Sequence, residues 1–154
     1  MLAAIDFTTV EVWTRHGLVT FYILFVMELA TRRVHFAGVS PNPDDRWMKQ
    51  MARNLTAADE GFLAGNRYVL MDRDSKFSEA FRTTLLNANV KSVRLPPRSP
   101  NLNAYLERFW RSLREECLDR MIFFGEDRLR CALHDCPRHV APKEIADTGT
   151  AAAA

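Results

Sequence analysis

The chain has 154 residues, enough for one domain of ordinary size with a buried core. Hydrophobic residues make up 47% and charged residues 26% of it, which are the proportions of a folded globular protein and exclude a disordered chain. The formal net charge is +2, a value that neither requires nor excludes a nucleic-acid partner.

No membrane partner is expected, because the most apolar run, Leu18 to Met27, is about half as long as the roughly 20 residues of a membrane helix. No export signal follows Met1. The three cysteines are too few and too clustered for the disulfide framework of a secreted protein. These features together favour a cytoplasmic location.

Three strand-like segments come first, over residues 3–12, 18–27 and 33–39. They are rich in aromatic and β-branched residues, which favour strands. The polar turn at residues 15–17 separates the first two and predicts a hairpin. The third segment would extend the hairpin into an antiparallel meander.

Helices and strands alternate after this meander, with Asp44 or Asn42 as the N-cap of the first helix and Ser78 as that of the second. The predicted elements are a helix over 44–58, a strand over 67–71, a helix over 78–87, a strand over 89–95, a helix over 101–119 and a short helix over 126–133. This order predicts an α/β fold, a mixed five-stranded sheet with helices on both faces. The first 133 residues would form one domain, and residues 134–154 an irregular, aberrant or disordered tail.

The longest predicted helix, over residues 101–119, has an apolar stripe at helical spacing formed by Leu106, Trp110, Leu113 and Cys117. It lies in the most basic part of the sequence, since residues 91–120 include seven Lys or Arg and four Asp or Glu. We therefore expect one face of this helix to pack on the sheet and a charged face to remain accessible.

Three acidic residues stand where a buried sheet would make a carboxylate costly. Asp6 lies inside an apolar strand, Asp72 ends another, and Glu107 lies beside the apolar stripe of the long helix. A divalent cation stabilises several carboxylates at once, so a shared metal site would explain all three. Taken singly, each has an alternative: a strand-edge aspartate, a β-turn residue and a solvated helix face.

The motifs around these residues resemble the DDE-type integrase core of insertion-sequence transposases and retroviral integrases. The segment Ile5–Asp6–Phe7–Thr8 matches the first motif, and MDRDSKF, with Phe77 five residues after Asp72, matches the second. SPNLNAYLERFWRSLREE contains Glu107 in the context of the third, with 34 residues between Asp72 and Glu107, close to the family's usual gap. The resemblance covers about residues 3–130 and implies an RNase H-like fold.

The resemblance implies that Asp6, Asp72 and Glu107 are catalytic and bind two Mg²⁺ or Mn²⁺ ions. The reaction would be phosphoryl transfer on double-stranded DNA, with strand cleavage and strand transfer, by a protein that is a homo-oligomer when active. Asn103, Arg111 and Arg114 share the helix face of Glu107, and together with Arg98 they are candidate DNA contacts. The alternative for this face is a solvated surface with an Arg111–Glu115 pair.

Two departures from the family pattern leave alternatives open. Asp74 stands where many relatives have Gly, so it competes with Asp72 as a ligand, although its spacing to Glu107 fits less well. The tail after His134 differs from that of relatives, so the chain could also be a truncated, frameshifted, non-catalytic nucleic-acid-binding remnant of a transposase, or another RNase H-like nuclease. Four potential zinc ligands crowd that region, but their spacing favours an incidental tail: Cys131, His134, Cys136 and His139.

Overall fold

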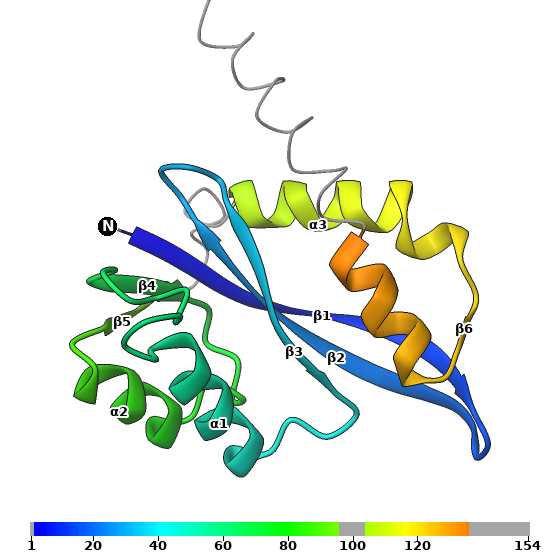
Figure 1. The fold of residues 1–154 in the computed structure, drawn as a ribbon, viewed down its shortest axis with the longest axis horizontal. Helices are drawn as coiled ribbons and strands as arrows, with labels where there is room; N and C mark the ends of the chain where they lie inside the picture. Colours follow the sequence, from blue (N-terminus) through cyan, green and yellow to red (C-terminus); the bar gives the residue numbers. More distant parts are fainter. Residues whose placement is uncertain (1, 96–103, 136–154) are drawn as a thin grey trace, which may run out of the picture.

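One long hairpin forms the centre of the sheet (Figure 1). The computed structural model describes residues 2–95 and 104–135, with side chains from residue 107 onward in the second range. β1 spans Leu2–Thr14 and β2 spans Gly17–Glu28, and the two pair antiparallel along their whole length. Arg15 and His16 form the turn, and Gly17 after them has a φ of 97°, which glycine adopts without strain. The predicted hairpin is confirmed.

The other strands extend the sheet on both sides of this hairpin. β3, Val34–Ser40, pairs antiparallel with β2 and completes the predicted meander. β4, Tyr68–Met71, is parallel to β1, and β5, Lys91–Arg94, is parallel to β4. The strand order β3-β2-β1-β4-β5 is the predicted mixed five-stranded sheet. β6, Phe123–Phe124, was not predicted; it pairs with the far end of β1 as a sixth strand.

Helices cover both faces of the sheet, as predicted. α1, Asp45–Leu55, and α2, Glu79–Asn87, lie on one face (Figure 1). The other face is covered by α3, Ala104–Glu116, and by the helix over 126–135. A 3-10 turn, η2, Leu118–Arg120, follows α3.

Side-chain alternation along β1 divides the core into two layers. Ala3 and Ile5 belong to the layer under α1 and α2, whereas Ala4 and Val12 belong to the layer under α3. Asp6 continues the second set, so its side chain lies on the α3 face of the sheet. The alternation of one strand therefore decides which helix the candidate acidic residue meets.

The helix ends follow the capping signals in the sequence. The side chain of Asp44 accepts a hydrogen bond from the Trp47 backbone N–H, and Ser78 does the same for Phe81. In α3, Trp110 and Leu113 of the predicted stripe are buried, but so is Phe109, which the predicted stripe left out. No helix in the described ranges is long and apolar enough to cross a membrane. The last predicted helix continues to residue 135, and the rest of the predicted tail lies outside the described residues.

Candidate active site

Asp6 lies in a part of β1 that has a strand on only one edge. On the edge away from β2, β4 pairs with residues 2–4 of β1 and β6 pairs with residues 12–13. Between these two pairings, none of the described strands covers that edge of β1. Asp6 is half-buried there, and its Oδ1 accepts a hydrogen bond from the Phe7 backbone N–H at 2.8 Å. Asp6 therefore lies in a stretch of β1 whose backbone pairs with β2 alone among the described strands.

Asp72 directly follows β4, the strand that runs parallel to β1. Leu70 of β4 pairs with Ala4 of β1, and β4 ends one residue later at Met71, so Asp72 lies just beyond the paired part of the two strands. Leu70 and Ala4 belong to the same core layer, and alternation along β1 puts Asp6 on the same α3 face. The negative charge of Asp72 acts on Asp6, so the two carboxylates lie in the same neighbourhood.

The loop after Asp72 contains a second aspartate whose carboxylate already has partners. Asp74 Oδ1 accepts from the Lys76 backbone N–H at 2.9 Å, and its Oδ2 from Lys76 Nζ at 2.7 Å. Lys76 Nζ also lies 5.1 Å from the centre of the Phe7 ring and 5.0 Å from that of Tyr22. The Asp72 carboxylate, by contrast, accepts the Asp74 backbone N–H at 3.0 Å. The sequence analysis did not single out Lys76, although it lies within the second motif.

Glu107 reaches the site from α3. It is exposed in the first turn of the helix. Phe109 and Trp110, two and three residues further along, pack into the core. Trp110 meets Phe25 of β2 edge-on with ring centres 4.2 Å apart. This contact fixes the rotation of α3 over the sheet, which leaves Glu107 free to face the accessible side.

Electrostatics link these carboxylates to one another. Burial raises the pKa of Asp6 from 3.8 to about 6; the Phe7 N–H opposes the rise, and the negative charges of Asp72, Asp74 and Glu107 add to it. Asp72 and Glu107, the other two predicted site residues, are therefore close enough to Asp6 for their charges to raise its pKa. Across residues 2–95 and 104–135, however, no three Asp, Glu, His or Cys side chains are arranged to hold a metal ion.

Arg114 points inward rather than toward solvent. Its Nη2 donates to Thr8 Oγ1 at 2.9 Å and to the Thr9 carbonyl at 2.6 Å, and its Nε donates to Thr8 Oγ1 at 3.2 Å. Thr8 is buried and lies two residues from Asp6, on the same face of β1. The guanidinium thus ties α3 to the strand that contains Asp6. The prediction of a DNA contact took account of helix spacing and missed this partner.

The other predicted DNA contacts differ in where they lie. Arg111 is exposed on α3, one turn after Glu107. Arg98 and Asn103 lie outside the described residues.

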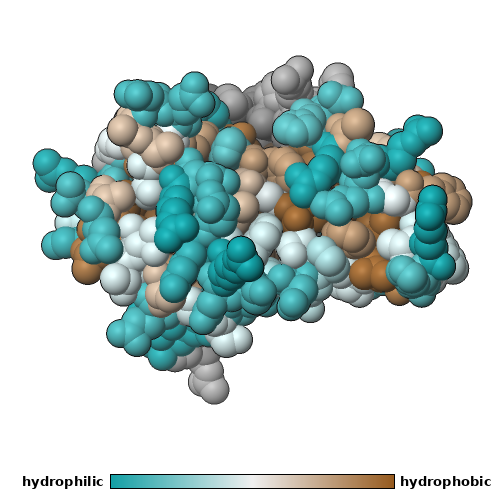
Figure 2. Space-filling view, turned by 60° about the horizontal axis from the view of Figure 1, so that its bottom comes forward, coloured by the Kyte–Doolittle hydropathy of each residue, from teal (hydrophilic) through white to brown (hydrophobic). Residues whose placement is uncertain are grey.

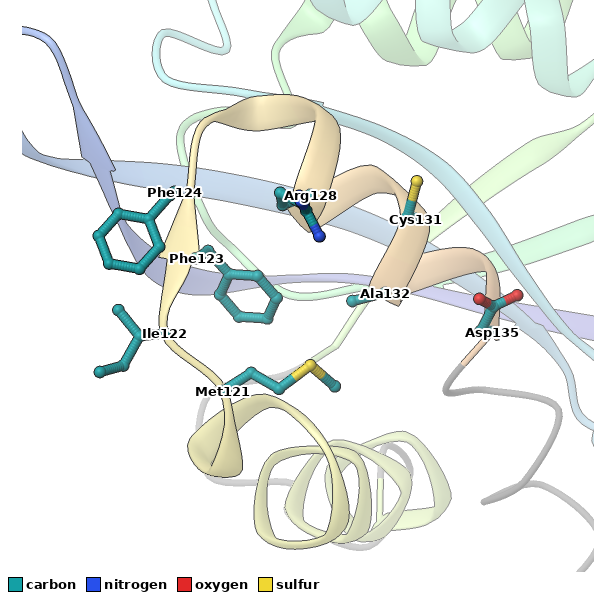
Figure 3. Close-up of a pocket in the computed structure, with 8 residues that line it drawn as sticks. All are labelled: Met121, Ile122, Phe123, Phe124, Arg128, Cys131, Ala132 and Asp135. Carbon is teal, nitrogen blue, oxygen red and sulfur yellow. The ribbon is translucent and has the colours of Figure 1, made fainter.

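The potential zinc ligands do not form a site in the described part of the chain. Cys131 is an exposed free thiol, and His134 packs edge-on against Phe36 with ring centres 5.7 Å apart. Cys136 and His139 lie outside the described residues. A cavity of about 610 Å³ beside Cys131 is lined by residues of β6 and of the helix over 126–135 (Figure 3). None of the predicted site residues lines it.

Comparisons with known proteins agree with the fold. A chain of the simian T-cell lymphotropic virus intasome, solved in complex with the PP2A regulatory subunit B56 gamma, superposes with a TM-score of 0.58 at 13% identity. The match covers 86% of this chain and 46% of that one. The catalytic core domain of BIV integrase gives 0.52 at 15% identity, covering 74% of this chain and 66% of that one. The chain has the fold of an integrase catalytic core.

The sequence comparison adds a local match to the same family. Residues 88–139, about a third of the chain, match the model of the integrase core domain. This segment contains Glu107, Arg111 and Arg114 but neither Asp6 nor Asp72. No curated protein matches the sequence. The resemblance to an integrase core that the motifs indicated is confirmed. The roles of individual residues stay predictions.

Proposed function

We propose that this chain catalyses metal-dependent phosphoryl transfer on DNA, cleaving and joining strands in integration or transposition. The observation that supports this most directly is that Asp72 directly follows β4, the strand parallel to β1, and that its negative charge acts on Asp6. Glu107 lies on α3 and its charge acts on Asp6. We infer that Asp6, Asp72 and Glu107 would together form one metal-binding site, supported by the effect of the other two charges on Asp6.

The donor set fits a hard divalent cation. All three candidate ligands are carboxylates, the groups that Mg²⁺ and Mn²⁺ prefer, and burial and like charge make the ionised form of Asp6 unfavourable without a cation. Asp6, Asp72 and Glu107 would hold up to two Mg²⁺ or Mn²⁺ ions, and when bound these would stabilise charge on the attacking and leaving oxygens of the phosphoryl group. The side chains of Asp72 and Glu107 would turn toward Asp6 to complete the site, since the described residues hold no closed metal group.

Asp72 is the better second ligand than Asp74. Lys76 occupies both oxygens of the Asp74 carboxylate, and a protein cation already balances its charge. Asp72 directly follows the strand parallel to β1, and within the described residues its carboxylate accepts a hydrogen bond only from the Asp74 backbone N–H. We therefore assign Asp74 and Lys76 to fixing the loop, anchored in the core by the buried Phe77.

Two arginines of α3 would have different tasks. Arg111, exposed one turn from Glu107, would contact the phosphate backbone of double-stranded DNA, as would Arg98 and Asn103. Arg114 would be a positioning residue, because its donors hold Thr8 and Thr9 next to Asp6. The active form would be a homo-oligomer, with residues 1–133 as its catalytic domain.

A DNA cleavage assay on the purified chain tests the proposal. Cleavage of a duplex should require Mg²⁺ or Mn²⁺ and stop with EDTA, and Asp72→Asn should abolish it while Asp74→Asn retains activity within about tenfold of the unmodified chain. Both variants remove one negative charge from the same loop, so they are matched. Loss with Asp74→Asn and retention with Asp72→Asn would reverse the assignment. DNA binding without any metal-dependent cleavage would instead support a non-catalytic nucleic-acid-binding protein.

A further inference from the structure

A row of exposed apolar side chains crosses the end of the β1–β2 hairpin. Trp13 of β1 pairs with Leu18 of β2 on one side and with Phe124 of β6 on the other. Ile122 precedes β6 and points to the same side as Phe124, away from the helix over 126–135 (Figure 3). We call Leu18, Trp13, Phe124 and Ile122 the hairpin row.

The hairpin row lies on a part of the sheet that no described helix covers. Val12 is buried under α3, so alternation sends Trp13 to the opposite face, which α1 and α2 cover only at its other end (Figure 1). Trp13 is 48% exposed, Leu18 52%, Phe124 69% and Ile122 72%. The end of the hairpin lies at the right of Figure 1, and Figure 2 shows apolar side chains gathered at the right-hand end of the molecule, among hydrophilic ones.

The row is rigid enough to act as a preformed surface. Thr14 Oγ1 donates to the Gly17 carbonyl at 2.9 Å and closes the hairpin turn, and the Gly125 N–H donates to the Trp13 carbonyl at 2.9 Å and holds the end of β6. Surface that is already ordered costs little entropy when it binds.

We propose that the hairpin row is the interface through which two copies of this chain associate. The exposed fractions correspond to roughly 500 Å² of apolar side chain, at the upper end of the largest patch that a monomer typically exposes. Two such rows stacked on each other would bury about 1,000 Å², the lower limit of a specific interface. The association is therefore weak and depends on concentration.

The charges beside the row favour a second copy over other occupants. Glu11 lies two residues before Trp13 and Arg15 two residues after it, and both are exposed. A two-fold axis at Trp13 would bring Glu11 of each copy next to Arg15 of the other, so the surface is complementary to itself. DNA does not fit, because an apolar row with one flanking arginine offers little to a phosphate backbone.

This proposal names a surface for the oligomer that the proposed function includes, and its test needs neither DNA nor metal. Sedimentation velocity of the full chain, at concentrations up to about 100 µM, should show a weak monomer–dimer equilibrium in which the fraction of dimer rises with concentration. Phe124→Glu and Ile122→Glu should each raise the dissociation constant at least about tenfold. Leu86→Glu, at an apolar side chain of α2 that is 54% exposed, is the matched control and should leave it unchanged.

A charge swap separates self-association from other binding. Arg15→Glu and Glu11→Arg should each weaken the dimer, and the double variant should restore it to within about threefold of the original. A chain that is monomeric throughout, a dimer that persists in both row variants, or a swap without restoration overturns the proposal. A monomer that binds phospholipid vesicles through the row would assign the surface to a membrane instead. Because cleavage is not measured, none of these results depends on whether the proposed function is correct.

Discussion

Replacing Asp6 with Asn should make the metal-free protein more stable at neutral pH. Asp6 ionises with a pKa near 3.8 in the unfolded chain and about 6 in the folded one, chiefly because of burial, with added repulsion from its acidic neighbours. Between these values the folded state binds more protons than the unfolded state, so stability falls as pH rises and stays low above pH 6. The rise in pKa corresponds to about 3 kcal/mol, an upper value because the side chain is partly exposed to screening solvent.

Asn removes this cost and keeps the local hydrogen bond, since its amide oxygen can still accept the Phe7 N–H. Urea unfolding without metal should show Asp6→Asn more stable by up to about 3 kcal/mol at pH 7, and the two proteins should converge below about pH 4. Asp59→Asn, at an exposed aspartate, should give no such gain. Equal stability of the two proteins at all pH values would refute the argument that this carboxylate is destabilising.

Adding metal should reverse the order of the two proteins. A ligand that binds only the folded state stabilises it by about 2.7 kcal/mol at a hundred times its dissociation constant. The unmodified chain should gain stability with saturating Mg²⁺ or Mn²⁺, whereas Asp6→Asn should gain little. A gain of the same size in both proteins would contradict Asp6 as a ligand while leaving the metal-free result intact.

Four further substitutions test the elements around the site. Arg114→Gln should destabilise the fold by about 1–3 kcal/mol in urea unfolding, because Thr8 loses its buried partner. Arg111→Gln should leave stability unchanged and lower the salt dependence of DNA binding by about one phosphate contact. The reverse pattern would indicate that Arg114, and not Arg111, contacts DNA. Phe77→Ala should cost about 3–5 kcal/mol, because the ring is fully buried and anchors the loop after β4. Ser78→Ala should cost about 1 kcal/mol by removing the N-cap of α2, so a neutral result in thermal unfolding would contradict the capping bond.

The strands and helices were predictable where one period lasted over several residues. β1, β2 and β3 have long apolar or alternating stretches, and the caps of α1 and α2 are polar residues before an apolar pattern. β6 has only two residues, too short for any period, and its formation depends on β1, where Trp13 pairs with Phe124 from 111 positions earlier in the chain. Phe109 was missed because the stripe of α3 was assigned from four residues at one spacing.

The site was predictable only as far as local motifs and chain order go. Spacing placed Arg111 and Arg114 on one face of α3, but it could not show that Thr8, 106 residues away, accepts the guanidinium of Arg114. Spacing to Glu107 favoured Asp72 over Asp74, and the structure adds a reason that no spacing contains, the contact of Lys76 with both oxygens of Asp74. Partners that come together by folding are not encoded in the separation of residues along one segment.

The length of β1 accounts for both the site and the hairpin row. With 13 residues it is about three times as long as β4, which covers only its first part, while β6 covers its far end. Asp6 lies in the uncovered middle of the strand, and the overhanging end supports Trp13 outside the core layer under α1 and α2. If β4 were extended to pair with the whole of β1, its backbone would fill the opening beside Asp6, and the carboxylate would be buried without a partner. If Asp6 binds a cation as proposed, the mismatch in strand length would be a condition for it, because a carboxylate buried without a partner is costly.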